Sequence, residues 1–488
     1  MGGVSPQHGL GSFSLSTQGP RSEPFGGEAG AAPLRLEVVA HLRLRLARDH
    51  DFGKRVRLPS TIRNWEVAQV LQAGAAVADV TPEVGYPLEG YHREGVSVGV
   101  LDRLEVAALV LDDGRRRCVL VTVDSVGLSV PQSDDLRRAI ATTCGSGLMG
   151  VMVCYSHTHS GPVADPTYLE LLRARAGIAA TEALNRMCPA VARWDVGQAD
   201  ASVNRRSLGT AGNAFMGARA DGALDRRVGV LTLASTAGDR IAVVVRYSAH
   251  ANVLKSDNLL ISADWPGAVR RAVAPGVGCP ILVLNGSAGD ANPRWRGTEG
   301  DLLHMGAAIG SEVLSITNRN APLAELPLLV ARTGFRLELQ DLPDPEEASR
   351  LAKEAKDMWG VDPATWLRAV DARRSAGEVR ITIPIEVQGL GVGSGVLVGV
   401  PMETFTQLAL NFEAQFATQP AFFNGYTGGW VGYLPAEEDF AHGGYEVSWA
   451  PISHGPGTGW LMPVRPETGS DLVRAAARMV VLSSHASI

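Results

Sequence analysis

Apolar runs rich in β-branched residues recur along the chain from residue 71 onward and predict the strands of a buried sheet. The predicted strands are 104–111, 118–124, 149–154, 228–234, 241–248, 280–285, 326–338, 378–388 and 396–400. Segments with the helical spacing of apolar residues lie between several of them, at 133–143, 167–187, 301–317, 345–372, 403–416 and 469–482. Some strands follow one another across short turns such as Asp113-Gly114, which favours antiparallel pairing. The pattern therefore predicts an α/β fold with layered sheets of mixed parallel and antiparallel strands and flanking helices.

The first 70 residues follow a different pattern. Residues 1–30 are rich in Gly, Ser, Pro and Gln and show no apolar period, and 34–63 are rich in Arg. We predict that 1–70 form a low-complexity, Arg-rich extension that is disordered or precedes the true start of the protein. No linker or change of composition divides 71–488, so one large domain is expected there.

The composition and charge of the chain argue against some classes of binding partner and location. The 488 residues carry 45 Lys and Arg against 51 Asp and Glu, a formal net charge of −6, which argues against nucleic acid as a partner. No apolar run is long enough for a transmembrane segment and the start lacks the features of a secretory signal, so we expect a cytoplasmic protein. The five cysteines are widely spaced, which argues against a disulfide framework or a cysteine-based zinc site. The sequence does not indicate the oligomeric state.

The strongest candidate site is the segment SHTHSGP at 156–162, which carries His157 and His159. It follows the predicted strand 149–154, and open α/β sheets place their ligands at the carboxyl ends of strands. The H-x-H spacing would put both imidazoles on one side of an extended backbone. Neutral imidazole is a favoured zinc ligand, so the pair favours a metal site over a loop with two hydrogen-bonded histidines.

Two further strand ends carry candidate ligands. His250 follows the predicted strand 241–248; alone it would be interpreted as structural, but together with His157 and His159 it favours a metal site. Glu403 follows 396–400 and is predicted to begin a helix. An acid is favourable there through the helix dipole, so ligand and helix-terminal interpretations both stand. Asp124 ends another predicted strand and is a candidate to support the ligands from behind.

Two glycine-rich segments form candidate walls of the site. Residues 285–294 (NGSAGDANPR) must form a tight polar turn, but they lack the Lys of a phosphate-binding loop. Residues 424–435 (NGYTGGWVGYLP) place Gly beside aromatic side chains, which suits a pocket wall as well as ordinary packing. No G-x-S-x-G motif indicates a serine nucleophile.

Taken in order, these segments resemble the catalytic domain of the neutral, non-lysosomal ceramidases. SHTHSGP is the most specific shared motif, and AGAAVADVTP at 73–82 resembles the first strand of that family. The other matching segments are Gly90-Tyr91, VTVD at 121–124, Asn204-Arg205-Arg206, SAHAN at 248–252, GDANP at 289–293, PMETFT at 401–406 and GGYE at 443–446. The resemblance covers about 71–488.

The resemblance implies a mixed α/β domain built around a single Zn²⁺ ion. It implies that the zinc ligands are His157, His250, Glu403 and Tyr445. It also implies that His159 faces the substrate and that Arg205 holds a polar group of it. The implied reaction is hydrolysis of an amide carbon–nitrogen bond, in N-acylsphingosine or a related small-molecule amide, by water that the metal activates. A site with imidazole, carboxylate and phenolate ligands would also accept manganese or iron.

The chain departs from the family at one position of the GDANP segment, where Asn292 replaces a serine. An amide does not ionise but can donate a hydrogen bond to an oxyanion, so Asn292 is expected to be a catalytic group. Ceramide itself becomes a less expected substrate than another amide. Two alternatives remain: a metalloenzyme of the same fold that acts on a carbohydrate or other hydroxyl-rich substrate, and a metal-stabilised binding protein without catalysis.

Overall fold

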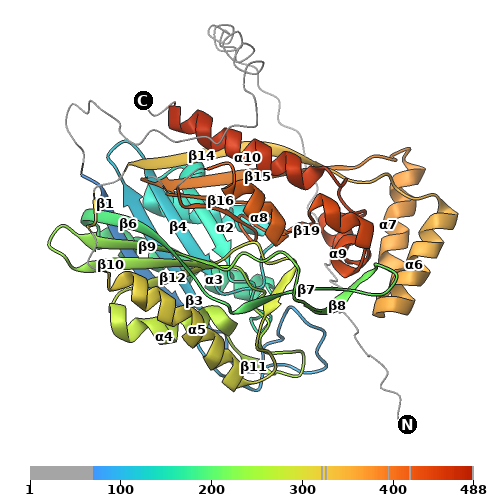
Figure 1. Cartoon of the computed structure of the whole chain (residues 1–488), viewed down its shortest axis with the longest axis horizontal. Helices are drawn as coiled ribbons and strands as arrows, with labels where there is room; N and C mark the ends of the chain where they lie inside the picture. The colour runs from blue at the N-terminus through green and yellow to red at the C-terminus, as the bar shows by residue number, and fades with distance from the viewer. Residues whose placement is uncertain (1–69, 320–321, 325–326, 394, 417–418, 486–488) are drawn as a thin grey trace, which may run out of the picture.

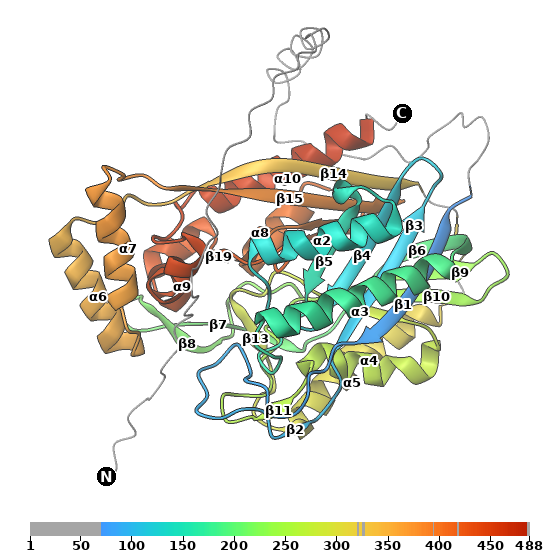
Figure 2. The same cartoon turned by 180° about the vertical axis from the view of Figure 1, so that it is seen from behind.

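Eight strands form the largest sheet, in the order β12-β10-β9-β6-β1-β3-β4-β5 (Figures 1 and 2). The computed structural model describes residues 70–319, 322–324, 327–393, 395–416 and 419–485, so the predicted extension lies outside it except for Val70. The strands are β1 (Gln72–Asp79), β3 (Glu105–Asp112), β4 (Arg117–Val123), β5 (Val151–Tyr155), β6 (Cys188–Gln198), β9 (Arg227–Ser235), β10 (Arg240–Tyr247) and β12 (Ile281–Asn285). β10 pairs with β12 and β4 with β5 in parallel, and the other neighbours are antiparallel. The predicted mixed sheet is confirmed, with β6 as an additional strand.

Four helices cover one face of this sheet: α2 (Val130–Cys144), α3 (Pro166–Asn185), α4 (Asp264–Val277) and α5 (Glu299–Thr317). Alternate residues of each strand point toward them. Val106 and Ala108 of β3 pack with α2 and α3, whereas Val243 and Val245 of β10 pack with α4 and α5. Figure 2 shows α2 and α3 in front of the sheet, and Figure 1, from the opposite side, shows α4 and α5 in front, because the sheet twists strongly between its two ends.

The other face of the sheet curves so that its two edges approach each other. β12 lies against β3, β4 and β5, although it stands at the opposite end of the strand order. The carboxyl ends of β5 and β12 therefore meet, and Asn285 donates a hydrogen bond from Nδ2 to the backbone oxygen of Ser156 at 3.2 Å. This curvature creates the place where the candidate site lies.

A second, four-stranded sheet fills the concave face, in the order β14 (Leu328–Glu338), β15 (Thr382–Val392), β16 (Gly395–Gly399) and β18 (Ala421–Asn424). Leu390 and Phe422 of this sheet share a core with Leu109 and Leu231 of the large sheet. The opposite side packs against further helices, with α10 lying along β14 and β15 (Figure 1). These helices are α6 (Pro345–Trp359), α7 (Ala364–Ser375), α8 (Thr406–Glu413), α9 (Ala450–Thr458) and α10 (Thr468–His485).

Short elements complete the described chain. They are β2 (Gly99–Val100), β7 (Ser202–Leu208), β8 (Ala214–Arg219), β11 (Leu260–Ile261), β13 (Ala291–Pro293), β17 (Met402–Thr404), β19 (Gly432–Leu434), the 3₁₀ turns η1 (Leu148–Gly150) and η2 (Glu437–His442), and the π-helical turn η3 (Tyr445–Trp449). β2 pairs with β11, β7 with both β8 and β13, and β17 with β19. Among the helices of the described ranges, none combines the length and the apolar character that crossing a membrane requires.

Two predicted helices differ in the structure. The predicted helix 345–372 is divided into α6 and α7, because Gly360 takes a left-handed conformation (φ +66°) and ends α6. The predicted helix 403–416 begins only at Thr406, because the residues before it pair with β19 as the short strand β17. Five further elements, α4, α9, β7, β8 and β18, were not predicted, and the ends of most predicted elements shift by a few residues. The predicted fold class, a single large domain of layered mixed sheets with flanking helices, is confirmed.

Candidate metal centre

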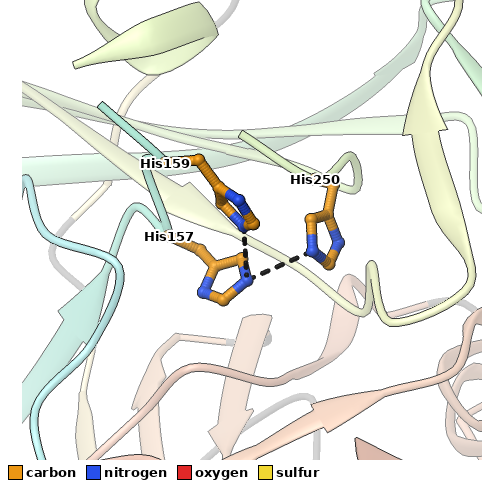
Figure 3. Close-up of side chains that lie close together, drawn as sticks. All are labelled: His157, His159 and His250. Atoms are coloured by element: carbon orange, nitrogen blue, oxygen red, sulfur yellow. Dashed lines mark hydrogen bonds between the residues drawn. The ribbon is translucent and has the colours of Figure 1, made fainter. Parts of the chain in front are cut away.

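Three buried histidines meet where the ends of β5 and β10 converge (Figure 3). His157 and His159 follow β5, and His250 follows β10. The Nε2 atom of His157 lies 3.2 Å from Nε2 of His250 and 3.3 Å from Nε2 of His159. The structure thus brings together the three histidines that the sequence analysis grouped.

Glu403 reaches the same point from β17, which pairs with β19 in a separate two-stranded sheet. Its Oε2 atom lies 3.3 Å from Nε2 of His157 and 3.5 Å from Nε2 of His250. The prediction that Glu403 begins a helix is wrong: it lies in β17, so the helix dipole does not explain this acid. Trp430 Nε1 donates to Oε1 at 2.9 Å, and the Tyr426 hydroxyl donates to Oε2 at 3.4 Å. We call His157, His250 and Glu403 the ligand cluster.

Backbone carbonyls orient the two histidines of the ligand cluster. Nδ1 of His157 lies 2.6 Å from the oxygen of Val126, and Nδ1 of His250 lies 2.9 Å from the oxygen of Ala288. A carbonyl oxygen only accepts, so each Nδ1 carries the proton, and in the neutral tautomer each Nε2 presents a lone pair. Burial and the charge of Arg205 hold the pKa of His250 well below its usual range, so this ring stays neutral.

The ligand cluster has the spacing of a tetrahedral metal site. Two imidazole lone pairs and a carboxylate oxygen that face one another at 3.2, 3.3 and 3.5 Å repel unless a cation lies among them. Four ligand atoms placed tetrahedrally about 2.0–2.1 Å from zinc lie about 3.3–3.4 Å from one another. Histidines that donate their second ring nitrogen to a carbonyl, and a hydrogen-bonded carboxylate, are the usual support of such ligands. The residues present therefore fit a cation of the size of zinc.

His157 is held in a left-handed backbone conformation, with a φ of +63°. The prediction of an extended H-x-H backbone is therefore wrong in detail: a sharp turn at the first histidine directs the imidazoles, rather than strand alternation. Tyr426 is left-handed as well (φ +52°), and its ring centroid lies 4.4 Å from that of His157. Such conformations cost about 1–3 kcal/mol each and persist where the surroundings hold them, commonly at functional sites.

His159 lies on the outer side of the histidine group. Its side chain is 9% exposed, against 3% for His157 and 2% for His250. Among the described residues its Nδ1 has no hydrogen-bond partner, so no carbonyl fixes this ring as it does the other two. Burial and the positive charges around it hold its pKa well below the usual range, so the ring is neutral. An unanchored neutral imidazole beside the ligand cluster suits a group that faces a substrate.

Arg205 lies at the edge of the site in a buried ion-pair network. Its Nε atom donates to Oε1 of Glu446 at 2.8 Å, and one terminal nitrogen donates to the Tyr433 hydroxyl at 3.1 Å. Arg206 donates to the other oxygen of Glu446 at 2.8 Å, so one carboxylate holds two neighbouring guanidinium groups. The network fixes the segment that carries Tyr445 against β7. Sequence reasoning missed this role of Glu446, although it is the last residue of the GGYE motif.

Tyr445 forms its hydrogen bond to a residue outside the ligand cluster. Gly443 and Gly444, both with positive φ, lead the chain into η3, and the Tyr445 hydroxyl lies 2.9 Å from Nε2 of His454 on α9. Among the described residues, this imidazole is the hydrogen-bond partner of the hydroxyl. Burial and the nearby charge of Glu403 raise the pKa of Tyr445, which places the phenol within electrostatic range of the ligand cluster.

Asn292 lies on β13, next to the turn that anchors His250. The backbone oxygen of Ala291 accepts from the His250 backbone N–H at 2.8 Å. The Asn292 side chain is buried, its Oδ1 has no partner within the described ranges, and its Nδ2 faces Met216 Sδ at 3.9 Å. Its amide is therefore not engaged in a strong structural hydrogen bond.

Several residues of the site differ from the sequence-based expectations. Asp124 does not contact the histidines; its carboxylate binds Arg270 and the backbone of Glu105. Trp430 and His454 were not expected as supports of Glu403 and Tyr445. Trp430 lies in the Gly-aromatic segment that was named as a candidate pocket wall. His454 is a single histidine in the segment 450–458, and no motif there pointed to it.

Two solved structures share this architecture. The neutral ceramidase from Pseudomonas aeruginosa superposes with a TM-score of 0.64 and 16% sequence identity, over 86% of this chain and 75% of that chain. A ceramidase complexed with C2 superposes with a TM-score of 0.63 and 16% identity, over 85% and 75%. The fold is ceramidase-like. No protein-family model matches the chain, and no curated protein matches its sequence.

At 16% identity the ceramidase-like fold is established, while the roles of individual residues rest on the distances and hydrogen bonds given above. The ceramidase-like fold also explains the order in which the segments that resemble the ceramidases follow one another along the chain. SAHAN and GDANP both lie at the convergence of β10 and β12, and PMETFT brings Glu403 to the same point.

Proposed function

We propose that this chain is a zinc-dependent hydrolase that cleaves an amide carbon–nitrogen bond. The ligand cluster carries the proposal, because two oriented imidazoles and a carboxylate at tetrahedral spacing lie within a ceramidase-like fold. One zinc ion per chain would be held by His157, His250 and Glu403, with Tyr445 as the fourth proposed ligand. Such an ion polarises a carbonyl oxygen and lowers the pKa of water to about 7.

The chain's own residues would bind the amide and move its protons. Nε2 of His159 faces the ligand cluster and would take up the proton of the attacking water and pass it to the leaving nitrogen. Asn292 Nδ2 would donate to the oxygen on which negative charge develops. Arg205, fixed by Glu446 and Tyr433, would hold a polar group of the substrate. Trp430 and Tyr426 keep the Glu403 carboxylate in place.

Metal analysis of the purified protein tests the proposal. We expect about one zinc per chain in the wild type and its loss in His157→Ala and Glu403→Ala, because each substitution removes one of the three clustered ligands. His304→Ala is the matched control, because this exposed histidine stacks on Trp295 at a centroid distance of 4.0 Å and takes no part in the site.

Release of fatty acid from short- and long-chain ceramides and from simpler N-acyl amines then tests the reaction. We expect hydrolysis of at least one of these amides by the wild type and its loss in both cluster variants. A wild type that carries no metal after incubation with zinc, or that hydrolyses amides equally well without His157 and Glu403, would contradict the proposal.

A further inference from the structure

Two arginines flank the outer side of the histidine group without a carboxylate partner. Arg93 donates a hydrogen bond to the backbone oxygen of His159 at 2.7 Å, and Arg296 donates to the Tyr91 hydroxyl at 3.2 Å. The Tyr91 ring lies between them and contacts the His159 ring, with centroids 4.8 Å apart. We call Arg93 and Arg296 the arginine pair.

The contacts of the arginine pair leave its charge uncompensated. Arg93 donates to three backbone carbonyls, those of Glu89, His159 and Asn258. Arg296 donates to the backbone oxygen of Asn252 and to a phenol. Within the described ranges neither guanidinium forms an ion pair. These contacts orient the two guanidinium groups without neutralising them.

Other arginines of the fold provide the contrast. Arg205 and Arg206 share Glu446, Arg246 binds Asp225 at 2.5 Å, and Arg270 binds Asp124. These four buried guanidinium groups are thus each supplied with a carboxylate. The arginine pair is only half-buried and lies beside His159, the most exposed of the three histidines.

Among the described residues, none of the acids near the arginine pair forms an ion pair with it. The carboxylate of Asp264 accepts from the backbone N–H groups of Val253 and Leu254, each at 3.0 Å. Burial raises the pKa of Glu89 to about 7, whereas a carboxylate paired with a guanidinium would show a lowered pKa. Asp257 is exposed and acts on Arg93 only through space.

Both guanidinium groups lie against the residues that surround His159. Arg93 binds its backbone oxygen, and Arg296 binds Tyr91, whose ring contacts the His159 ring. The region outside the ligand cluster is therefore positive, and an anionic group would bind there through charge-assisted hydrogen bonds. A neutral ceramide has no group that would use this charge.

We propose that the arginine pair binds an oxyanion of the substrate, so that the preferred substrate is an amide that carries a carboxylate or phosphate near the scissile bond. This inference rests on the proposed amide hydrolysis and names the substrate class of the same site. Arg93 and Arg296 would grip the oxyanion, while His159 and the ligand cluster face the amide.

Matched amides that differ in charge test the inference. N-dodecanoylglycine carries a carboxylate, N-dodecanoylethanolamine is its neutral counterpart, and N-dodecanoylethanolamine phosphate carries a phosphate. We expect kcat/KM for an anionic amide to exceed that of the neutral amide about 10- to 100-fold, mainly through KM, because hydrogen bonds between charged groups contribute that much when partly buried. The preference should shrink as NaCl is added. Comparison of the carboxylate amide with the phosphate amide shows which oxyanion the site prefers.

Arg93→Gln and Arg296→Gln should each remove most of the preference, and Arg93→Lys and Arg296→Lys should restore part of it. Zinc content should stay at the wild-type value in all four variants. If the two arginines only stabilised their loops, the substitutions would lower zinc content and would affect anionic and neutral substrates equally. Arg103→Gln is the matched control, because its side chain is 77% exposed and pairs with Asp79. A preference that survives in the double Gln variant, or a neutral amide hydrolysed as well as both anionic ones, would overturn the inference.

Binding measurements separate this inference from the proposed function. Ketone analogues, in which CH₂ replaces the amide NH, cannot be hydrolysed, and their binding to the zinc-loaded protein can be measured by calorimetry. Tighter binding of the anionic ketone that depends on the arginine pair, without hydrolysis of any amide, would support the anion site and contradict the proposed function. Hydrolysis without any anion preference in binding or turnover would contradict the anion site alone.

Discussion

The candidate site joins two regions of the chain that position their side chains by different means. The first region, 71–317, supplies the histidines from the ends of regular strands, and backbone carbonyls fix His157 and His250. The second region, 328–485, supplies Glu403 from a three-residue strand and Tyr445 from a π-helical turn. Side chains rather than carbonyls hold these two groups. Substitutions that leave the backbone intact should therefore disturb the second half of the site more than the first.

Removing the ion pair that joins the two regions should have the largest effect. In Glu446→Gln, Arg205 and Arg206 lose the carboxylate that binds both of them in a buried position. Breaking a buried pair on one side costs about 3–5 kcal/mol, so we expect a fall of that size in the free energy of unfolding, measured by denaturant titration.

The control for this variant is Glu354→Gln, which removes an exposed helical pair with Arg350. Its free energy of unfolding should change by at most about 0.5 kcal/mol. Equal effects of the two substitutions would show that the Glu446 network does not join the regions.

A substitution behind Glu403 should sharpen the difference between backbone and side-chain support. Trp430→Phe removes the indole N–H that donates to Oε1 and keeps most of the ring. Loss of such a support lowers metal affinity or activity about 10- to 100-fold, so we expect weaker zinc binding in competition with a chelator. Trp194→Phe is the control, because within the described residues its Nε1 has no hydrogen-bond partner and its ring packs on Phe422. Equal zinc affinity in both variants would contradict this role of Trp430.

Per unit of pH, the smallest expected effect is a pH dependence at a second link between the regions. Asp290, in the first region, accepts from the backbone N–H and the hydroxyl of Thr406, in the second. Burial raises its pKa to about 7, above the ordinary value of 3.8 that applies in the unfolded chain. The folded protein therefore binds more protons between about pH 4 and pH 7, and the contribution of Asp290 to stability falls as the pH rises through this window, by at most about 1.4 kcal/mol per pH unit.

The comparison of wild type with Asp290→Asn isolates this group. The amide does not titrate, so the stability of the wild type relative to the variant should be highest near pH 4 and should decline toward pH 7. Thermal or urea unfolding at several pH values measures the difference. If the difference in stability between wild type and variant stayed constant from pH 4 to pH 7, the pKa of Asp290 would be the same in the folded and the unfolded protein.

The regular part of the fold could be predicted from the sequence because its signal is local. The apolar runs of β3, β4 and β10 are long and β-branched, and their predicted ends agree with the structure to within about a residue. β6 was missed because its sequence, CPAVARWDVGQ, includes Pro, Arg and Asp and alternates only weakly. Gly360 interrupts a helical pattern that otherwise continues, and its effect depends on a left-handed conformation that the pattern does not reveal.

The site could be predicted only where its residues follow strand ends. His157, His159 and His250 were grouped on that basis, and the structure brings them together. Glu403 was named because it follows the predicted strand 396–400, but it was placed at a helix start instead of in β17, because three residues are too few for a recognisable strand. The roles of Glu446, Trp430 and His454 depend on contacts between segments far apart in sequence, and no local pattern carries that information.

The curvature of the large sheet also has a consequence for the order of folding. The contacts that assemble the site close large loops: Asn285 contacts Ser156 across 129 residues, and Arg205 contacts Glu446 across 241. Closing such loops is entropically costly and slow, so these contacts form after the local strands and helices. The complete set of ligands is thus assembled only when the second region has docked. Binding of a metal ion would then report on the completion of folding rather than begin it, and a growing chain would acquire the site only after its second region had been synthesised.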